Sequence, residues 1–459
     1  MKISKVVLSI LIAILIFAVG DFSSAAEFTN YSININNTLT YSQRDFELNG
    51  KGKFFIGKIS SSSNSEYILS LEIPGNYGTI SYFDDLKNLQ IHELVDSVLP
   101  KQRLIFISTD KVHFIIGQPY VYKDLGYGTI LDIGAQDFSI RKHNGKFIVS
   151  YSYALNSEYY GILWALRSDN MLVDFSDSNQ LSLWEYYDVD EMARLGFDGY
   201  HYKSPSTYFP YYSNSYWRIP SDYLANSLIR TGGSLASDIM GNALLRIAHE
   251  NINEKGFIPS LPRSTWLYND YGIDAGFFDT RFNADTIETN VKAYIKFGDS
   301  VYRDAYLKLA EYYMNHGKEH KKVNYSIYGA EGWLVDDYYN TGGKPTLTAL
   351  NHQLQAMHSF YLLYEQERDL SYLEFADKML QGIKNTVNLW IMPDGNLEYA
   401  YMEDGSMGRK DYEYLTYNDL FNVQNDLIRI RGYRDDDLDV LMHYKKIWMD
   451  SNGITEYMK

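Results

Sequence analysis

The sequence predicts a multidomain α+β protein in which a β-sheet or β-sandwich region is followed by an α/α toroid, an incomplete barrel of helix pairs. Two observations predict it. Between residues 27 and 177, short segments rich in β-branched and aromatic residues alternate with turn residues. From residue 224 to 459, apolar residues recur at helical spacing, and aromatic, Gly-bearing loops separate the periodic segments. Between them, we expect residues 178–223 to form a Tyr-rich connector.

The composition limits the function before any motif is considered. The chain has 459 residues, no cysteine, 43 tyrosines and a formal net charge of -16. Zero cysteine excludes disulfides, thiolate metal sites and thiol catalysis. The acidic balance argues against nucleic acid as a partner, because such a protein needs a basic face. Tyrosine offers an apolar ring for sugars and a hydroxyl that can give up a proton.

The first 26 residues have the pattern of a secretory signal peptide. Lys2 and Lys5 precede an almost wholly apolar run over 6–19, and small residues lead to an expected cleavage near Ala26. The alternative is an uncleaved anchor, although the run is shorter than the roughly 20 residues that a spanning helix needs. No later stretch is long and apolar enough to span. We therefore expect an extracellular protein without a membrane span after cleavage.

Four segments of the first region have clear strand character, and Gly75-Asn76, Asn144-Gly145 and Asn49-Gly50 are typical of the turns between strands. The expected strands are 67–73, 103–108, 111–116 and 146–152.

Seven segments of the second region have helical periodicity. In one of them, Tyr302, Tyr306, Leu309 and Tyr313 fall on a single stripe. The expected helices are 223–250, 286–297, 301–316, 346–365, 370–389, 418–431 and 435–449. In a toroid the loops at one end line a cleft. The alternative is an irregular helical domain without a cleft.

The sequence has no phosphate loop, no His-Glu-x-x-His motif and no Gly-x-Ser-x-Gly motif. Four segments instead combine acidic residues with aromatic ones, mostly tyrosines. His352 and His358 are six residues apart on one predicted helix, which is poor spacing for a shared metal. The four segments are 332–340, 394–401, 412–427 and 263–281.

Residues 333–449 resemble the C-terminal domain of the D-glucuronyl C5-epimerases that act on heparosan and heparan sulfate. The family has an aromatic–acidic–acidic–Tyr segment, a helix with Leu-Asn, a Gly-bearing turn followed by Tyr, a Tyr-initiated helix with Asn and Gln, and a last helix with an aromatic residue near its end. The matching residues are Trp333 to Tyr338, Leu350-Asn351, Gly395 to Tyr399, Tyr417 with Asn422 and Gln424, and Leu438 to Trp448. The acidic pair is Asp336-Asp337 where the family has Glu, and Tyr414 is an alternative to Tyr417.

The resemblance implies an isomerase that converts D-glucuronate to L-iduronate in a polysaccharide. Such an enzyme removes the C5 proton, stabilises the resulting enediolate and returns a proton to the other face. The implied catalytic residues are Asp337 with Tyr338 on one face and Tyr399 with Tyr417 on the other, and Asp336 is an alternative acid. The expected substrate-binding residues are Arg263, Trp266, Arg281, Trp333 and Asn351. Arg263 and Arg281 are chosen because a guanidinium binds a carboxylate bidentately.

No redox cofactor is required by this chemistry, and a structural cation such as calcium is left open. The acidic net charge favours an unsulfated, heparosan-like or other glucuronate-containing polysaccharide as partner. A homodimer is also left open.

Three other functions fit the same residues. A polysaccharide lyase begins with the same proton abstraction and then expels the C4 oxygen. A glycoside hydrolase would use two carboxyls, here Asp337 with Asp279. A non-catalytic glycan-binding protein would bind without reaction.

Overall fold

The structure is a computed structural model that describes residues 27–191, 194–203 and 208–459. The predicted signal segment 1–26 and its cleavage near Ala26 lie outside the described residues. None of the helices described reaches the length and hydropathy of a membrane span. The chain divides into two compact units, the first made of residues up to 206 with 210–248 and the second of 207–209 with 249–459.

The first unit contains two antiparallel sheets whose inner faces share one apolar core. Strand β4 shows why this core forms. Its apolar residues alternate inward while the residues between them face outward. The inward residues are Tyr67, Leu69, Leu71 and Ile73. The small sheet has the order β4 (Ser65–Pro74), β13 (Lys146–Leu155), β12 (Phe138–His143) and β7 (Ser97–Val98).

The large sheet is built around β14, which pairs with β3, β9 and β10. Its strands are β1 (Glu27–Asn34), β2 (Leu39–Glu47), β3 (Lys53–Ser61), β5 (Gly78–Phe83), β6 (Leu89–Glu93), β8 (Ile105–Thr109), β9 (His113–Ile116), β10 (Tyr120–Gly126), β11 (Thr129–Ala135), β14 (Tyr159–Ser168), β15 (Tyr202–Lys203) and β17 (Ser215–Arg218). All four strands expected from the sequence are present. Asn144 and Gly145 both have positive φ, as the tight turn between β12 and β13 requires.

Three helices lie in the described part of this first unit, where a connector and the start of the helical domain were expected. They are α1 (Ser178–Glu185), α2 (Tyr223–Arg230) and α3 (Leu235–Ala248), and a π-helical turn (Tyr186–Asp190) follows α1. The expected connector is therefore a folded segment, and its Tyr187, Tyr200 and Tyr202 are buried. The single helix expected over 223–250 is interrupted at residues 231–234, where Gly233 adopts a left-handed conformation.

The second unit is mainly helical, with short strands in the connections between its helices. Its helices are α4 (Thr265–Tyr271), α5 (Thr280–Phe297), α6 (Ser300–Glu319), α7 (Leu350–Glu367), α8 (Leu370–Asn385), α9 (Leu415–Arg431) and α10 (Asp436–Ser451), with 3₁₀ turns at His249–Asn251 and Val387–Trp390. Its strands are β16 (Tyr208–Phe209), β18 (Arg263–Ser264), β19 (Phe278–Asp279), β20 (Lys321–Tyr325), β21 (Glu331–Val335), β22 (Tyr338–Tyr339), β23 (Thr348–Ala349), β24 (Glu398–Tyr401) and β25 (Met407–Lys410).

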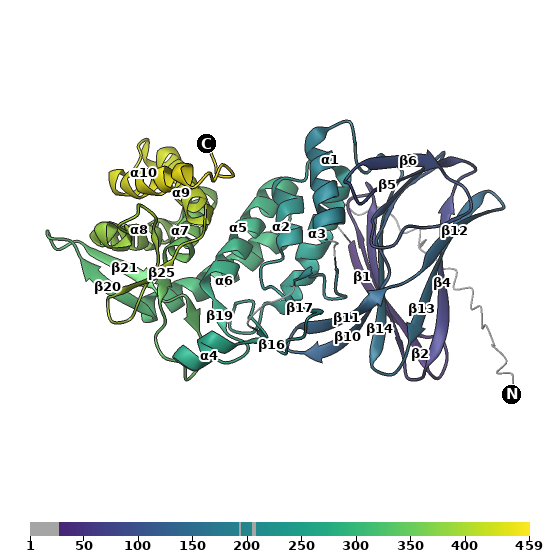
Figure 1. Cartoon of the computed structure of the whole chain (residues 1–459), viewed down its shortest axis with the longest axis horizontal. Helices are drawn as coiled ribbons and strands as arrows, with labels where there is room; N and C mark the ends of the chain where they lie inside the picture. Colours follow the sequence, from purple (N-terminus) through teal and green to yellow (C-terminus); the bar gives the residue numbers. More distant parts are fainter. Residues whose placement is uncertain (1–26, 192–193, 204–207) are drawn as a thin grey trace. The chain divides into compact units, whose positions relative to one another are not determined.

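The longer helices of this unit stack as pairs. Helix α5 packs against both α6 and α7, α7 packs against both α8 and α9, and α9 packs against α10 (Figure 1). The stripe predicted on α6 is confirmed, because Tyr302, Tyr306, Leu309 and Tyr313 are all buried. The fold is thus mixed α+β, with a row of helix pairs in the second unit. Closure of that row into a toroid stays a prediction.

Candidate functional site

The acidic segment singled out in the sequence connects β21 to β22 and then runs back toward helix α7. Thr346 holds this return in place, because its hydroxyl accepts a hydrogen bond from the Tyr338 amide at 3.1 Å and donates one to the Tyr338 carbonyl at 3.2 Å. The Asp337 amide donates to the Leu347 carbonyl at 3.0 Å. The backbone of Asp337 and Tyr338 is therefore fixed beside the N-terminus of α7.

Asp337 is a fully buried carboxyl without an ammonium or guanidinium partner among the described residues. Its Oδ2 atom accepts a hydrogen bond from the Ala349 amide at 2.9 Å and lies 3.6 Å from Nδ1 of His352. Its Oδ1 atom is buried and has no hydrogen-bond partner in the part of the chain that the structure describes. Burial raises the pKa of Asp337 well above its usual value. Burial also lowers the pKa of His352. Both shifts favour the neutral form of the group.

A second buried carboxyl, Asp279, lies next to Asp337 and caps helix α5. Strand β19 pairs with β22 so that Asp279 is opposite Tyr338, and the Asp279 carboxyl accepts the Phe282 amide at 3.1 Å. Burial raises the pKa of Asp279 to about 7, and the nearby charge of Asp285 adds to this. Asp279 also contributes to the raised pKa of Asp337, as expected for two acids sharing one site.

Three tyrosines lead from these carboxyls to the surface. The Tyr338 ring meets His352 edge-on at 5.6 Å and Trp266 at 5.6 Å. The Tyr399 side chain interacts with that of Tyr338 and is close enough to Asp337 to feel its charge. Tyr412 packs edge-on against Tyr399 at 5.7 Å. Tyr338 is 8% exposed and Tyr412 is 51% exposed, so the series runs inward. We call Asp279, Asp337, Tyr338, Tyr399 and Tyr412 the acid–tyrosine cluster.

Burial raises the pKa of each tyrosine in the cluster. At neutral pH the phenols of Tyr338, Tyr399 and Tyr412 are therefore protonated. Asp279, with a pKa of about 7, is a cluster member whose charge changes near neutral pH.

Tyr417, expected among the catalytic residues, lies in other surroundings. Its ring packs edge-on against Tyr457 at 5.1 Å. Burial raises the pKa of Tyr417, and the charged groups that act on it include Lys446 and Arg434 rather than Asp337. The third tyrosine of the cluster is instead Tyr412, which belongs to the same acidic and aromatic segment of the sequence as Tyr417.

Asp336 and Trp333 also face other partners. The Asp336 carboxylate forms a salt bridge with Lys322 at 2.6 Å. The Trp333 indole donates a hydrogen bond to Glu331 at 2.8 Å, and the Lys321 ammonium lies 4.5 Å from its ring centre.

The two arginines expected to bind a substrate carboxylate are engaged with carboxylates of the protein itself. Arg263 donates two hydrogen bonds to Asp274, at 2.6 and 2.8 Å. Arg281 forms salt bridges with Asp419 and with Asp285, and it also donates to the Asn351 carbonyl at 2.9 Å. The Oδ1 atom of Asn351 itself is buried without a hydrogen-bond partner among the described residues.

Arg409 is a cation near the acid–tyrosine cluster that the sequence did not nominate. It lies on β25, and its guanidinium carbon is 4.5 Å from the ring centre of Trp266, the residue that meets Tyr338. Its side chain is 45% exposed, and its closest carboxylate partner is Asp270 at 3.8 Å. The sequence held no signal for it, because only the pairing of β24 with β25 brings residue 409 to this place.

The described residues contain no group of three or more side chains arranged to hold a metal ion. A structural cation such as calcium stays open, and the absence of a redox cofactor stays an expectation.

No protein-family model and no curated protein matches the sequence. Several solved structures resemble it weakly. A family 76 glycoside hydrolase from a bovine Bacteroides thetaiotaomicron strain is 10% identical over 88% of this chain and 76% of its own, with a TM-score of 0.41. A GH76 α-mannanase from Bacteroides thetaiotaomicron is 16% identical over 50% and 58%, with a TM-score of 0.35. Cellobiose 2-epimerase from Spirochaeta thermophila is 11% identical over 50% and 58%, with a TM-score of 0.36. This chain therefore spans less than two thirds of the latter two proteins. Similarity at this level does not carry an activity over to it.

Proposed function

We propose that this protein is a carbohydrate-active enzyme whose reaction centre is the acid–tyrosine cluster. The observation that supports this is the position of Asp337, a buried acid without a cationic partner beside Tyr338 and Tyr399. A buried acid without a cationic partner destabilises a fold. Its presence here therefore favours a role other than stability. Perturbed acids next to phenols are typical of sites that transfer protons.

The reaction that we infer is C5 epimerisation of D-glucuronate to L-iduronate within a polysaccharide. The C5 proton must leave to a base, the charge must collect on the sugar carboxylate as an enediolate, and a proton must return from the opposite face. The protonated phenols of Tyr338 and Tyr399 are suited to return that proton and to donate hydrogen bonds to the enediolate. Ionisation of Asp279 near pH 7 supplies the negative charge that lets one cluster member act as base.

Arg409 is the group that we assign to the substrate carboxylate. Its guanidinium is half-exposed and close to Tyr338 through Trp266, whereas Arg263 and Arg281 already bind carboxylates. A guanidinium can bind the uronate bidentately, and the Trp266 ring offers an apolar face to the sugar.

Incubation with heparosan in deuterated water tests the proposal. We expect deuterium at C5 of glucuronate without chain cleavage, detected by NMR and mass spectrometry. Failure to incorporate deuterium into heparosan or any other glucuronate polymer supplied would exclude the epimerase. An unsaturated product absorbing in the near ultraviolet would instead identify a lyase.

The tyrosines offer a matched pair of variants. Tyr412→Phe removes a hydroxyl of the cluster, and we expect about a 10²-fold loss of C5 exchange, within the range for a proton-transfer group. Tyr417→Phe removes a hydroxyl that faces other partners, and we expect nearly full activity. The opposite result would restore Tyr417 to the centre and exclude Tyr412.

Glycoside hydrolysis is the second candidate, and the adjacent buried carboxyls Asp279 and Asp337 favour it. A carboxyl with a raised pKa is suited to be the general acid of a glycosidase, with the other carboxyl as nucleophile or base. Release of new reducing ends from a glycan, abolished by Asp337→Asn, would establish this reaction instead.

Localisation belongs to the same proposal. A secretory signal at 1–26 would deliver the enzyme to extracellular polysaccharides, and mass spectrometry of the secreted chain would show whether it begins at Glu27. A homodimer is left to measurement in solution.

A further inference from the structure

A pocket of about 320 Å³ opens on the face of strand β22 opposite the acid–tyrosine cluster. Successive side chains of a strand point to opposite faces. Tyr338 accordingly contacts Trp266 and His352, whereas Tyr339 faces the pocket and contacts His320. The pocket is therefore separate from the proposed reaction centre.

Two tyrosine rings line the pocket, and their packing holds each of them in place. Tyr312, from α6, packs against Phe257 at 4.5 Å and against Phe278 at 4.9 Å between ring centres. Tyr339, from β22, lies on the His320 ring at 4.2 Å. Both tyrosines are only partly buried, so ring surface stays available to a ligand.

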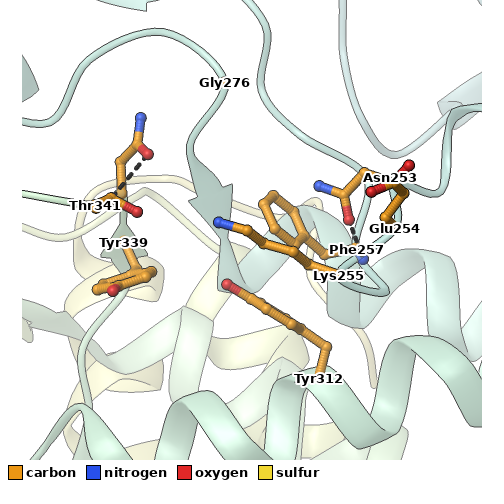
Figure 2. A pocket seen from close by; sticks show the side chains of 9 residues that line it. Asn253, Glu254, Lys255, Phe257, Gly276, Tyr312, Tyr339 and Thr341 are labelled. Carbon is orange, nitrogen blue, oxygen red and sulfur yellow. Dashed lines mark hydrogen bonds between the residues drawn. The ribbon is translucent and has the colours of Figure 1, made fainter.

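The pocket also contains a lysine directed at these rings. Figure 2 shows the Lys255 ammonium end and the Tyr312 hydroxyl pointing into the space on the side of Tyr339, while Glu254 lies beside Asn253. Among the described residues no carboxylate is within salt-bridge distance of Lys255. Its charge is available to an anion.

The backbone on both sides of the pocket is fixed. The Asn253 side-chain oxygen accepts hydrogen bonds from the amides of Gly256 and Phe257, at 3.0 and 3.1 Å, and so holds the turn that carries Lys255. On the other side, the Asn340 side chain donates to the carbonyls of Asp274 and Ala275 at 3.1 and 3.0 Å. Binding would therefore cost little ordering of the protein.

We propose that this pocket is an accessory saccharide-binding site for an acidic sugar residue of a polysaccharide. The ring faces of Tyr312 and Tyr339 match the apolar faces of pyranose rings, and Lys255 matches the carboxylate of a uronate. The volume is at the small end of the roughly 300–1,000 Å³ of ligand pockets, which suits one or two sugar units. The uronate class rests on the proposed function, whereas the pocket itself does not.

Hydrogen–deuterium exchange of the full-length protein with a heparosan octasaccharide tests this site, read by mass spectrometry. We expect protection of peptides covering 253–257 and 339–341. Lys255→Ala should weaken the binding that this protection reports by about ten-fold or more, the lower end for a hydrogen bond to a charged group. Lys318→Ala, an exposed lysine on the same helix as Tyr312 that does not line the pocket, should have no effect.

Two outcomes overturn the inference. One is the lack of protection at these peptides at millimolar octasaccharide. The other is protection that Lys255→Ala leaves unchanged or that a neutral cellohexaose produces equally. The C5 exchange assay is separate, because protection that depends on Lys255 in an enzyme without C5 exchange would keep the pocket and exclude the epimerase.

Discussion

The helical unit buries two groups of carboxyls and neutralises them in different ways. Among the described residues, Asp279 and Asp337 have no ammonium or guanidinium partner, and burial raises the pKa of both carboxyls, which favours their protonated forms. Glu288, Asp411, Asp419 and Asp426 instead contact Lys292, Lys445, Arg281 and His358, in that order. A buried charge needs a counter-charge or a proton. The comparison separates carboxyls that are paired with cations from carboxyls whose protonated form is favoured.

The largest change in stability should come from breaking the cation-paired group. His358, on α7, binds Asp426 on α9 at 2.6 Å and Glu288 on α5 at 3.3 Å, so it joins three helices. Removing one partner of a buried ion pair costs about 3–5 kcal/mol. We expect His358→Leu to lower the free energy of unfolding by about that amount in urea denaturation. A loss below about 1 kcal/mol would show that this network does not hold the helices.

A substitution in the group without cationic partners should change stability little and activity strongly. Burial favours the neutral form of Asp337, and Asp337→Asn places a neutral group of nearly the same shape there, so we expect the free energy of unfolding to change by less than about 1 kcal/mol. The rate of C5 exchange should fall by about 10²–10⁴-fold, as for loss of a proton-transfer group. Unfolding and kinetics on the same preparation would check both values, and full activity in this variant would remove Asp337 from the centre.

The pH dependence of stability separates the two groups further. Asp279 has a pKa of about 7 in the folded protein and a lower one when unfolded. The folded state thus binds this proton more tightly, and the contribution is complete below about pH 4 and lost as the pH rises through 7. We expect the wild type to lose stability relative to Asp279→Asn between pH 4 and 7. If the free energy of unfolding changes with pH in the same way in both proteins, Asp279 does not hold its proton in this range.

Much of this arrangement follows from local sequence, and the rest depends on pairing between distant segments. The stripe from Tyr302 to Tyr313 and the strand over 146–152 were predicted because hydrophobic period is a local property. Asp337, Tyr338 and Tyr399 were nominated from their motifs, and the structure places them together. Tyr412 lies in the segment 412–427 but was not nominated individually, and Arg409 was not nominated, because the contact with Tyr399 and the β24–β25 pairing decide their positions.

Arg281 shows the same dependence on distant segments. Nothing near Arg281 in the sequence shows that Asp419, 138 residues later, neutralises it. Its residue type suggested a binding role, and the structure shows that it is engaged in a tertiary ion pair.

The smallest effect should come from an ion pair of the same chemistry at the surface. Lys446 and Asp450 are one helical turn apart on α10, and both side chains are about half exposed. Water already solvates both charges, so such pairs contribute only about 0.3–0.5 kcal/mol. We expect Lys446→Gln to change the free energy of unfolding by no more than this in urea denaturation. A loss comparable to that of His358→Leu would mean that burial is not what distinguishes the paired carboxyls of the helical unit.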